Sequence, residues 1–273
     1  MNEALENINK IISKFDEVVA EYSDKPSADS QFEKEYSHYP DKDRITDPFT
    51  FGRINLRAGR EHLAMLPSLF QSNNIFAGSV VARAVLEASS LALWFLSPSI
   101  DENERVRRGL IQLSDGKNQV RQLGGNTSSI DDFFDNRLPK ILATLGLEYR
   151  DGKGKIVKPH KIKPSISDMI TVELGEKFRN DYRILSGMAH GQPVVLISFG
   201  YDIGNVVERN GSKEVEFKPS QSIAIFALFS VVEAYKKALE SSFEISGWDF
   251  TRVKPSFDNF FTSLSEAYKK SRA

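Results

Sequence analysis

Residues 75–96 constrain the fold more than any other part of the sequence. Apolar side chains occupy most sides of this segment when it is drawn as a helix: Val80, Val81, Val85, Leu86, Leu91, Leu93, Trp94, Phe95 and Leu96. A helix that is apolar on most sides is stable in water only when other elements cover it all round. Asn73 and Asn74 are suitable N-terminal caps, and Pro98 stops the helix. The segment therefore predicts a central buried helix within an all-α helical bundle.

Apolar residues recur at helical spacing in most of the remaining chain. Residues 1–22 carry a single apolar stripe, which predicts an amphipathic helix that packs on the body or pairs with a second chain. Residues 23–48 combine prolines and charges without periodicity, which predicts a linker. One helical domain is expected over residues 49–273, with helices near 51–70, 101–123, 131–145, 167–189, 220–242 and 256–270.

Three residues are expected to set boundaries within this domain. Pro67 should kink or end the helix that contains it, because proline lacks the backbone donor that a helix interior requires. Asp101 should cap the helix that follows it, and Gly175 is a point where the helix over residues 167–189 can break.

A small β-hairpin is expected after this last helix, at about residues 194–217. Residues 194–199, 206–207 and 215–217 are mostly apolar or β-branched, and Asn210-Gly211 lies between the last two segments. The preceding helix ends at His190-Gly191-Gln192-Pro193, where a glycine followed closely by a proline is a strong stop. The expected fold is thus a helical bundle with a β-hairpin insertion.

Composition limits the partners and the chemistry. The formal net charge is −1, so a surface for nucleic acid has to be a local patch. The absence of cysteine excludes disulfides and thiolate sites, and it fits a reducing cytosol. The charged residues 1–22 do not resemble a signal peptide, and the apolar run 84–96 is too short and polar to span a bilayer. We expect a cytoplasmic protein with no membrane partner.

Arg183 and His190 form the most suggestive pair of reactive side chains. They are seven positions apart, close to two helical turns, so they project from the same face of a helix. An arginine can hold a phosphate through parallel hydrogen bonds, while a histidine can move a proton near neutral pH. Together they could cleave RNA without a metal: His190 would take or give a proton, and Arg183 would stabilise the charged transition state.

An arginine, six intervening residues and a histidine at a helix end resemble the R-x(4–6)-H signature of the HEPN superfamily of helical nucleases and defence proteins. The wider segment of Tyr182, Arg183, Leu185, Ser186, His190 and Gly191 is also similar to a group of uncharacterised bacterial helical proteins that carry Arg83, Glu87 and Trp94 equivalents. The resemblance spans roughly residues 73–193. It implies a composite ribonuclease site at a homodimer interface, with Arg183 and His190 as catalytic residues. Ile184 follows the arginine, where many catalytic members have a polar residue.

The same residues also have structural interpretations. His190 could cap its helix by donating to the last free carbonyls, and Arg183 could pair with a buried carboxylate such as Glu87. In a functional site Glu87 would orient Arg183, with Arg83, Tyr182 and Ser186 as supporting residues. Alternatively, Arg83 and Glu87, four positions apart, form an ion pair within their own helix.

Residues 147–164 are the one clearly basic stretch. It carries Arg150, Lys153, Lys155, Lys158, Lys161 and Lys163. These side chains are candidates for phosphate contacts with RNA, which would be independent of base sequence. A solvated hairpin without a partner is the alternative, since runs of charge commonly remain solvated.

Three functions remain open. The first is a metal-independent endoribonuclease of HEPN type in a bacterial toxin or phage-defence system. Such a protein would bind RNA, form a homodimer and could bind an antitoxin or another protein. The second is a non-catalytic helical module that binds protein, nucleic acid or a small ligand. The third is an assembly protein that dimerises through its N-terminal helix. The sequence has no phosphate-binding glycine loop and no His-Glu-x-x-His motif, so we expect neither a cofactor nor a metal.

Overall fold

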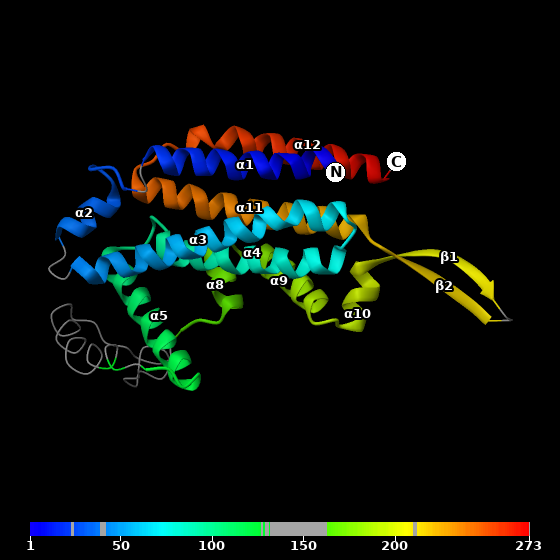
Figure 1. Cartoon of the computed structure of the whole chain (residues 1–273), viewed down its shortest axis with the longest axis horizontal. Helices are drawn as coiled ribbons and strands as arrows, with labels where there is room; N and C mark the ends of the chain where they lie inside the picture. Colours follow the sequence, from blue (N-terminus) through cyan, green and yellow to red (C-terminus); the bar gives the residue numbers. More distant parts are fainter. Residues whose placement is uncertain are drawn as a thin grey trace.

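Long helices build the body of the protein in the computed structural model (Figure 1), which describes residues 1–22, 25–38, 42–126, 128, 131, 163–209 and 212–272. The all-α prediction is confirmed for this part of the chain. The helices are α1 (Asn2–Glu21), α2 (Gln31–His38), α3 (Lys42–Gln71), α4 (Ile75–Leu96), α5 (Glu102–Gln122), α8 (Ile166–Glu173), α9 (Glu176–Ala189), α10 (Pro193–Val195), α11 (Gln221–Ser246) and α12 (Lys254–Arg272). Short turns of other helix types cover Leu196–Gly200 and Phe250–Arg252.

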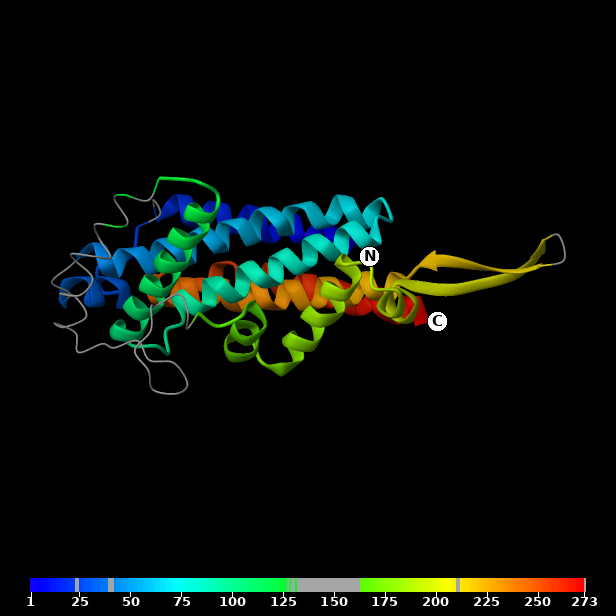
Figure 2. The ribbon, with the colours of Figure 1, turned by 90° about the horizontal axis from the view of Figure 1, so that it is seen from below.

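Helix α4 lies at the centre, as its apolar sequence predicts. It packs against α3 and α11 along its length and also contacts α5, α8 and α9 (Figures 1 and 2). Of the described helices, α4 alone is long and apolar enough to cross a membrane, and 67% of its most apolar window is buried inside the bundle. Its buried residues join those of α3, α9, α11 and α12 in one large apolar cluster.

The apolar stripe of α1 is covered by the same chain. Leu5, Ile8, Ile11 and Val18 are fully buried where α1 packs against α12 and α3. Figure 1 shows α1 and α12 side by side along one edge of the bundle, with the N-terminus near the C-terminus. The stripe is thus used within the protein, in agreement with the prediction that this helix packs on the body.

The linker predicted over residues 23–48 is wrong for most of its described part. Residues 31–38 form α2, and α3 begins at Lys42, so Pro48 lies inside a helix. Helix α3 also continues beyond Pro67 to Gln71. A proline inside a helix costs about 3 kcal/mol. Burial of Phe49, Leu56 and Leu66 against the neighbouring helices offsets this cost, which local sequence patterns cannot reveal.

Other predicted boundaries are confirmed. The Asp101 carboxylate accepts a hydrogen bond from the backbone of Glu104 at 2.8 Å, so it caps α5. Gly175 separates α8 from α9 with a backbone φ of 104°, in the region that favours glycine. The helix expected over residues 131–145 lies outside the described residues, apart from Asp131.

Two antiparallel strands, β1 (Tyr201–Arg209) and β2 (Ser212–Pro219), project from the end of the bundle (Figure 2). Residues 194–199, expected as a strand, are instead helical in α10 and the turn after it. Pro193 starts α10 at the position where proline fits a helix best. Val195 then packs over Gly187, where a Cβ would lie only 2.8 Å from the Val195 side chain. Tertiary packing here overrides the preference of β-branched residues for a strand.

Gly52 marks the closest approach of α3 to the end of α4. A Cβ at this position would lie 2.4 Å from Cγ of Leu96, which is 1% exposed and cannot move aside freely. We expect Gly52→Ala to lower the free energy of unfolding by about 1–3 kcal/mol, the usual cost of overpacking a core. Urea denaturation of the full chain measures this change.

Gly116→Ala is the matched control for this substitution. Gly116 lies in α5, and nothing would come within 4 Å of its added Cβ. Alanine favours a helix interior by about 0.5–1 kcal/mol over glycine, so this variant should gain stability. If both variants lose stability or both gain it, the close approach of Gly52 to Leu96 does not determine the effect of the alanine substitution on stability.

Candidate functional site

Four polar side chains meet where α9 crosses α4. Arg83 and Glu87 lie on consecutive turns of α4, Tyr182 comes from the middle of α9, and His190 is the residue that ends α9. The chain therefore brings together residues about a hundred positions apart. We refer to Arg83, Glu87, Tyr182 and His190 as the α4–α9 cluster.

Arg83 is the hub of this cluster. Its Nε donates to Oε1 of Glu87 at 2.8 Å, and its Nη1 lies 3.1 Å from Nε2 of His190. Its Nη2 donates to the Tyr182 hydroxyl at 3.4 Å, and the guanidinium carbon lies 5.4 Å from the centre of the Tyr182 ring. The ion pair and the ring together hold the guanidinium in one orientation.

The contact between Arg83 and His190 selects a tautomer of the histidine. A guanidinium only donates hydrogen bonds, so Nε2 of His190 must accept through its lone pair. The ring proton then lies on Nδ1. His190 is exposed, and its Nε2 therefore presents a basic lone pair beside a cation at the protein surface.

Partial burial shapes the electrostatics of the cluster. Desolvation lowers the pKa of Arg83, but the hydrogen bond and charge of Glu87 outweigh it and raise that pKa above its ordinary value. Burial and the charge of Glu87 raise the pKa of the Tyr182 hydroxyl, although Arg83 acts in the opposite direction. Arg83 stays cationic and Tyr182 stays neutral near pH 7.

Arg183 lies outside this cluster. Its side chain is exposed and makes no hydrogen bond or ion pair with the residues that the structure describes. The predicted pairing of Glu87 with Arg183 is wrong, and the alternative ion pair between Arg83 and Glu87 is confirmed. Successive residues of a helix point about 100° apart, so Tyr182 faces α4 while Arg183 faces solvent.

Ser186 contributes to the site through its backbone. Its carbonyl accepts the backbone N–H of His190 at 3.0 Å, which closes the last turn of α9. Gly191 then adopts a φ of 65°, and the chain turns into α10. The glycine and Pro193 thus end α9 at His190, as the sequence predicts, and the structure shows that the His190 side chain is exposed.

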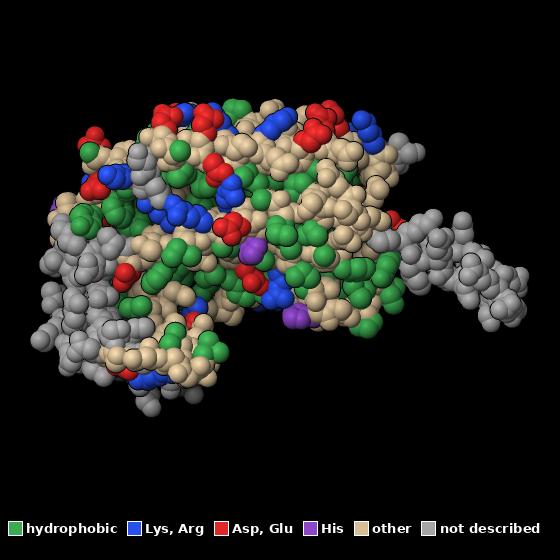
Figure 3. Space-filling view, viewed as in Figure 1, with side chains coloured by type: hydrophobic (Ala, Val, Ile, Leu, Met, Phe, Trp, Pro, Cys, Tyr) green, Lys and Arg blue, Asp and Glu red, His purple; other side chains and the backbone are tan. Residues whose placement is uncertain are grey.

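The predicted basic segment lies almost wholly outside the described residues, including Arg150, Lys153, Lys155, Lys158 and Lys161. Of its six basic residues only Lys163 is described, and its ammonium pairs with Asp115 at 2.7 Å. On the face shown in Figure 3, described Lys and Arg side chains are interspersed with Asp and Glu and do not form a continuous basic patch.

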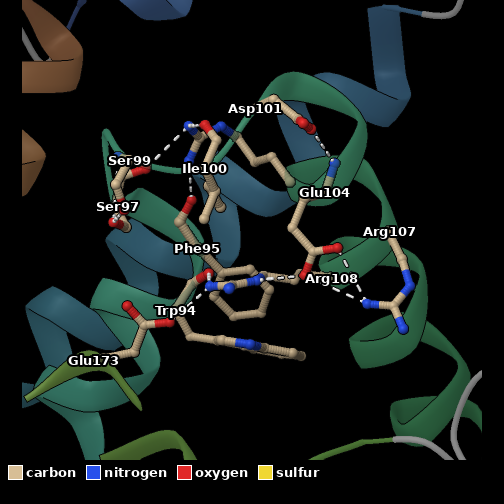
Figure 4. A network of polar contacts seen from close by, with 11 residues as sticks. Trp94, Phe95, Ser97, Ser99, Ile100, Asp101, Glu104, Arg107, Arg108 and Glu173 are labelled. Atoms are coloured by element: carbon tan, nitrogen blue, oxygen red, sulfur yellow. Dashed lines mark hydrogen bonds and ion pairs between the residues drawn. The ribbon is translucent and has the colours of Figure 1, made fainter. Parts of the chain in front are cut away.

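A second polar network, part of which Figure 4 shows, lies at the end of α4. Arg105 is fully buried and donates to both carboxylate oxygens of Glu35, with the shorter contact at 2.9 Å. It also donates to the carbonyls of Phe95, Ser97 and Ile100. These arginine contacts satisfy carbonyls that the helix leaves without intrahelical partners. These contacts stabilise the fold, and the pairing of Arg105 with Glu35 of α2 could not be predicted from residues 70 positions apart.

Arg108 repeats this arrangement one turn later on α5. It donates to the Trp94 carbonyl at 2.6 Å and pairs with Glu173 at 2.8 Å and Glu104 at 2.9 Å. Arg107 pairs with Glu104 as well. Within the part of the chain that the structure describes, no three His, Asp or Glu side chains are grouped to hold a metal.

No protein-family model, curated protein or solved structure matches this chain. The function of this chain is therefore inferred from the geometry of the α4–α9 cluster and from the spacing of Arg183 and His190.

Proposed function

We propose that the chain is a metal-independent ribonuclease whose reacting groups are His190 and Arg83. The observation that carries the proposal is the contact of Nε2 of His190 with the Arg83 guanidinium at 3.1 Å on an exposed surface. A proton acceptor and a phosphate-binding cation lie side by side there, and RNA cleavage requires both. The resemblance to the HEPN superfamily supports the same class of reaction and adds a toxin or phage-defence setting.

The reaction begins when RNA takes the place of Arg83 at the histidine. A ribose 2′-hydroxyl donates to Nε2 of His190, which removes its proton as the oxygen attacks the adjacent phosphorus. The new O2′–P bond forms as the P–O5′ bond breaks, and the products are a 2′,3′-cyclic phosphate and a 5′-hydroxyl end. The departing O5′ receives its proton from water. Neutral His190 is the form that starts this sequence.

Arg83 contributes charge and orientation. Its Nη1, released from His190, points toward the phosphate bound beside the histidine and can donate to a non-bridging oxygen. Glu87 keeps the guanidinium in place through Nε, and the Tyr182 hydroxyl does so through Nη2. Prepositioned donors stabilise the extra negative charge of the transition state more than that of the ground state.

Arg183 has a different role in this proposal from the one that its spacing to His190 suggests. It lies one residue beyond Tyr182 and projects into solvent, where it can contact a neighbouring phosphate of a bound strand. In a homodimer it could also reach the site of a second copy, as the HEPN resemblance implies. Binding a phosphate away from the reacting atoms affects the KM more than the kcat.

RNA cleavage by the full chain in EDTA tests this proposal, with single-stranded and structured RNAs as substrates. We expect Arg83→Ala to lower kcat/KM by about 10²–10³-fold, the usual effect of removing one transition-state donor. Arg183→Ala should act mainly on KM. Arg179→Ala is the matched control, because it removes a half-buried arginine of α9 that pairs only with Glu176 among the described residues.

Two results would reject the proposal. One is the absence of cleavage of every RNA by the folded wild-type protein. The other is equal cleavage by wild type and Arg83→Ala, which would point to a contaminating nuclease. In the first case a non-catalytic binding module becomes the better description.

A further inference from the structure

A cavity of about 440 Å³ lies between α9, α11 and α12. A second cavity of about 330 Å³ adjoins it and shares Ser222 and Phe226 of α11 as lining residues. Pockets that hold small organic ligands have volumes of about 300–1,000 Å³. The first cavity alone is therefore large enough for such a ligand.

Aromatic side chains make up much of the wall of the larger cavity. Phe226 and Phe229 come from α11, while Phe261 and Tyr268 come from α12. The Phe229 and Phe261 rings meet edge to face, with centres 5.5 Å apart. Phe229 and Tyr268 are each 39% exposed, so the aromatic wall is open to solvent. Such a surface suits an apolar or aromatic molecule.

One carboxylate interrupts this apolar wall. Asp181 of α9 lines the cavity and is only 6% exposed. Its Oδ2 accepts a hydrogen bond from the Ser230 hydroxyl at 2.6 Å. Its Oδ1 has no hydrogen bond, and the carboxylate has no ion pair, within the described part of the chain. Burial raises the pKa of this carboxyl, which the Ser230 hydrogen bond and the charge of Lys177 only partly oppose.

Lys177 is the nearby cation, but it is engaged elsewhere. Its ammonium pairs with Glu233 at 3.1 Å and lies 4.5 Å from the centre of the Phe229 ring. A buried carboxylate without an ion pair is costly, and a cation that enters the cavity would remove that cost. The cavity therefore favours a ligand that places a positive charge beside Asp181.

We propose that the cavity between α9, α11 and α12 binds a small organic ammonium ion, with its cationic group on Asp181 and its apolar body against the Phe226, Phe229 and Phe261 rings. This site is distinct from the α4–α9 cluster, and the inference does not depend on ribonuclease activity.

Calorimetric titration of the full chain at pH 7 with 2-phenylethylammonium tests this inference. The matched control ligand is 2-phenylethanol, which has the same ring and chain length without the charge. We expect a Kd of about 0.1–1 mM for the ammonium ion, in keeping with a ligand of so few atoms. The alcohol should bind at least about tenfold more weakly, because it offers Asp181 no charge.

Asp181→Asn is the matched protein variant. Its amide oxygen can still accept from Ser230, so the contact between α9 and α11 is retained while the charge is lost. The variant should bind the ammonium ion no better than the alcohol. Thermal unfolding and circular dichroism test whether the variant is folded. The comparison of the two ligands on the wild-type protein tests the proposal even if the variant does not fold.

Equal binding of the ammonium ion and the alcohol by the wild type would overturn the proposal. So would unchanged ammonium binding by folded Asp181→Asn. If the ammonium ion does not bind and light scattering shows a dimer, a second copy of the chain covers the cavity and the ligand assignment is wrong. None of these outcomes depends on RNA cleavage.

Discussion

Replacing His190 by alanine is expected to slow RNA cleavage by about 10²–10⁴-fold, the usual contribution of one general acid–base group. The loss should appear in kcat, because His190 acts on the 2′-hydroxyl proton in the transition state and makes little contribution to strand binding. The fold should be unaffected, since the His190 side chain is exposed and only its backbone closes α9. Single-turnover cleavage of a labelled RNA in EDTA measures the change.

His62→Ala is the control for this experiment. His62 lies on α3, is half-buried, and together with Arg57 also satisfies the shortest arginine–histidine spacing of the HEPN signature. Its removal should leave the cleavage rate within about threefold, since surface substitutions away from a site have small effects. Added imidazole should partly restore activity to His190→Ala. Equal losses in the two histidine variants would show that neither residue is specific to the reaction.

Arg105→Met is expected to lower the free energy of unfolding by about 3–5 kcal/mol, because it leaves the Glu35 charge buried without a partner. The side chains of Arg105 and Glu35 are 0% and 8% exposed. The substitution also removes the side-chain donor for the carbonyls of Phe95, Ser97 and Ile100 at the end of α4. Domain stabilities are only about 5–15 kcal/mol, so the loss is a large fraction of the total.

Urea denaturation of three variants tests this explanation. Arg107→Met removes an exposed ion pair with Glu104 and should cost less than about 1 kcal/mol. The double variant Glu35→Met with Arg105→Met should be more stable than Arg105→Met alone, since it no longer buries an unpaired carboxylate. A loss below about 1 kcal/mol for Arg105→Met would mean that Glu35 finds water or another partner.

The helices themselves could be predicted from local patterns. The boundaries of α4, the Asp101 cap of α5 and the break at Gly175 depend on residues a few positions apart, and the structure has them where the sequence places them. The errors have a common cause. The prolines inside α3 and the β-branched residues of α10 are helical because these segments pack against other helices. Their local preferences, against a helix interior for proline and for a strand for β-branched residues, are overridden.

The candidate site was predicted in part. Residues of the α4–α9 cluster were identified individually, and the Arg83–Glu87 pair follows from their spacing on one helix. The contact of His190 with Arg83 does not follow from the sequence, because the two residues are 107 positions apart. Asp181 was missed altogether. A lone aspartate on an amphipathic helix gives no signal until its surroundings are known.

The sequence by itself determined the helical class, the central position of α4 and the helix end at His190, since periodicity and helix-stop residues act over one or two turns. Only the tertiary structure decided which charges meet. Arg83 reaches His190, Arg105 reaches Glu35, and Asp181 faces an aromatic cavity because of how α9, α2 and α12 dock. These contacts join residues far apart in the chain, and their partners are selected by packing rather than by spacing.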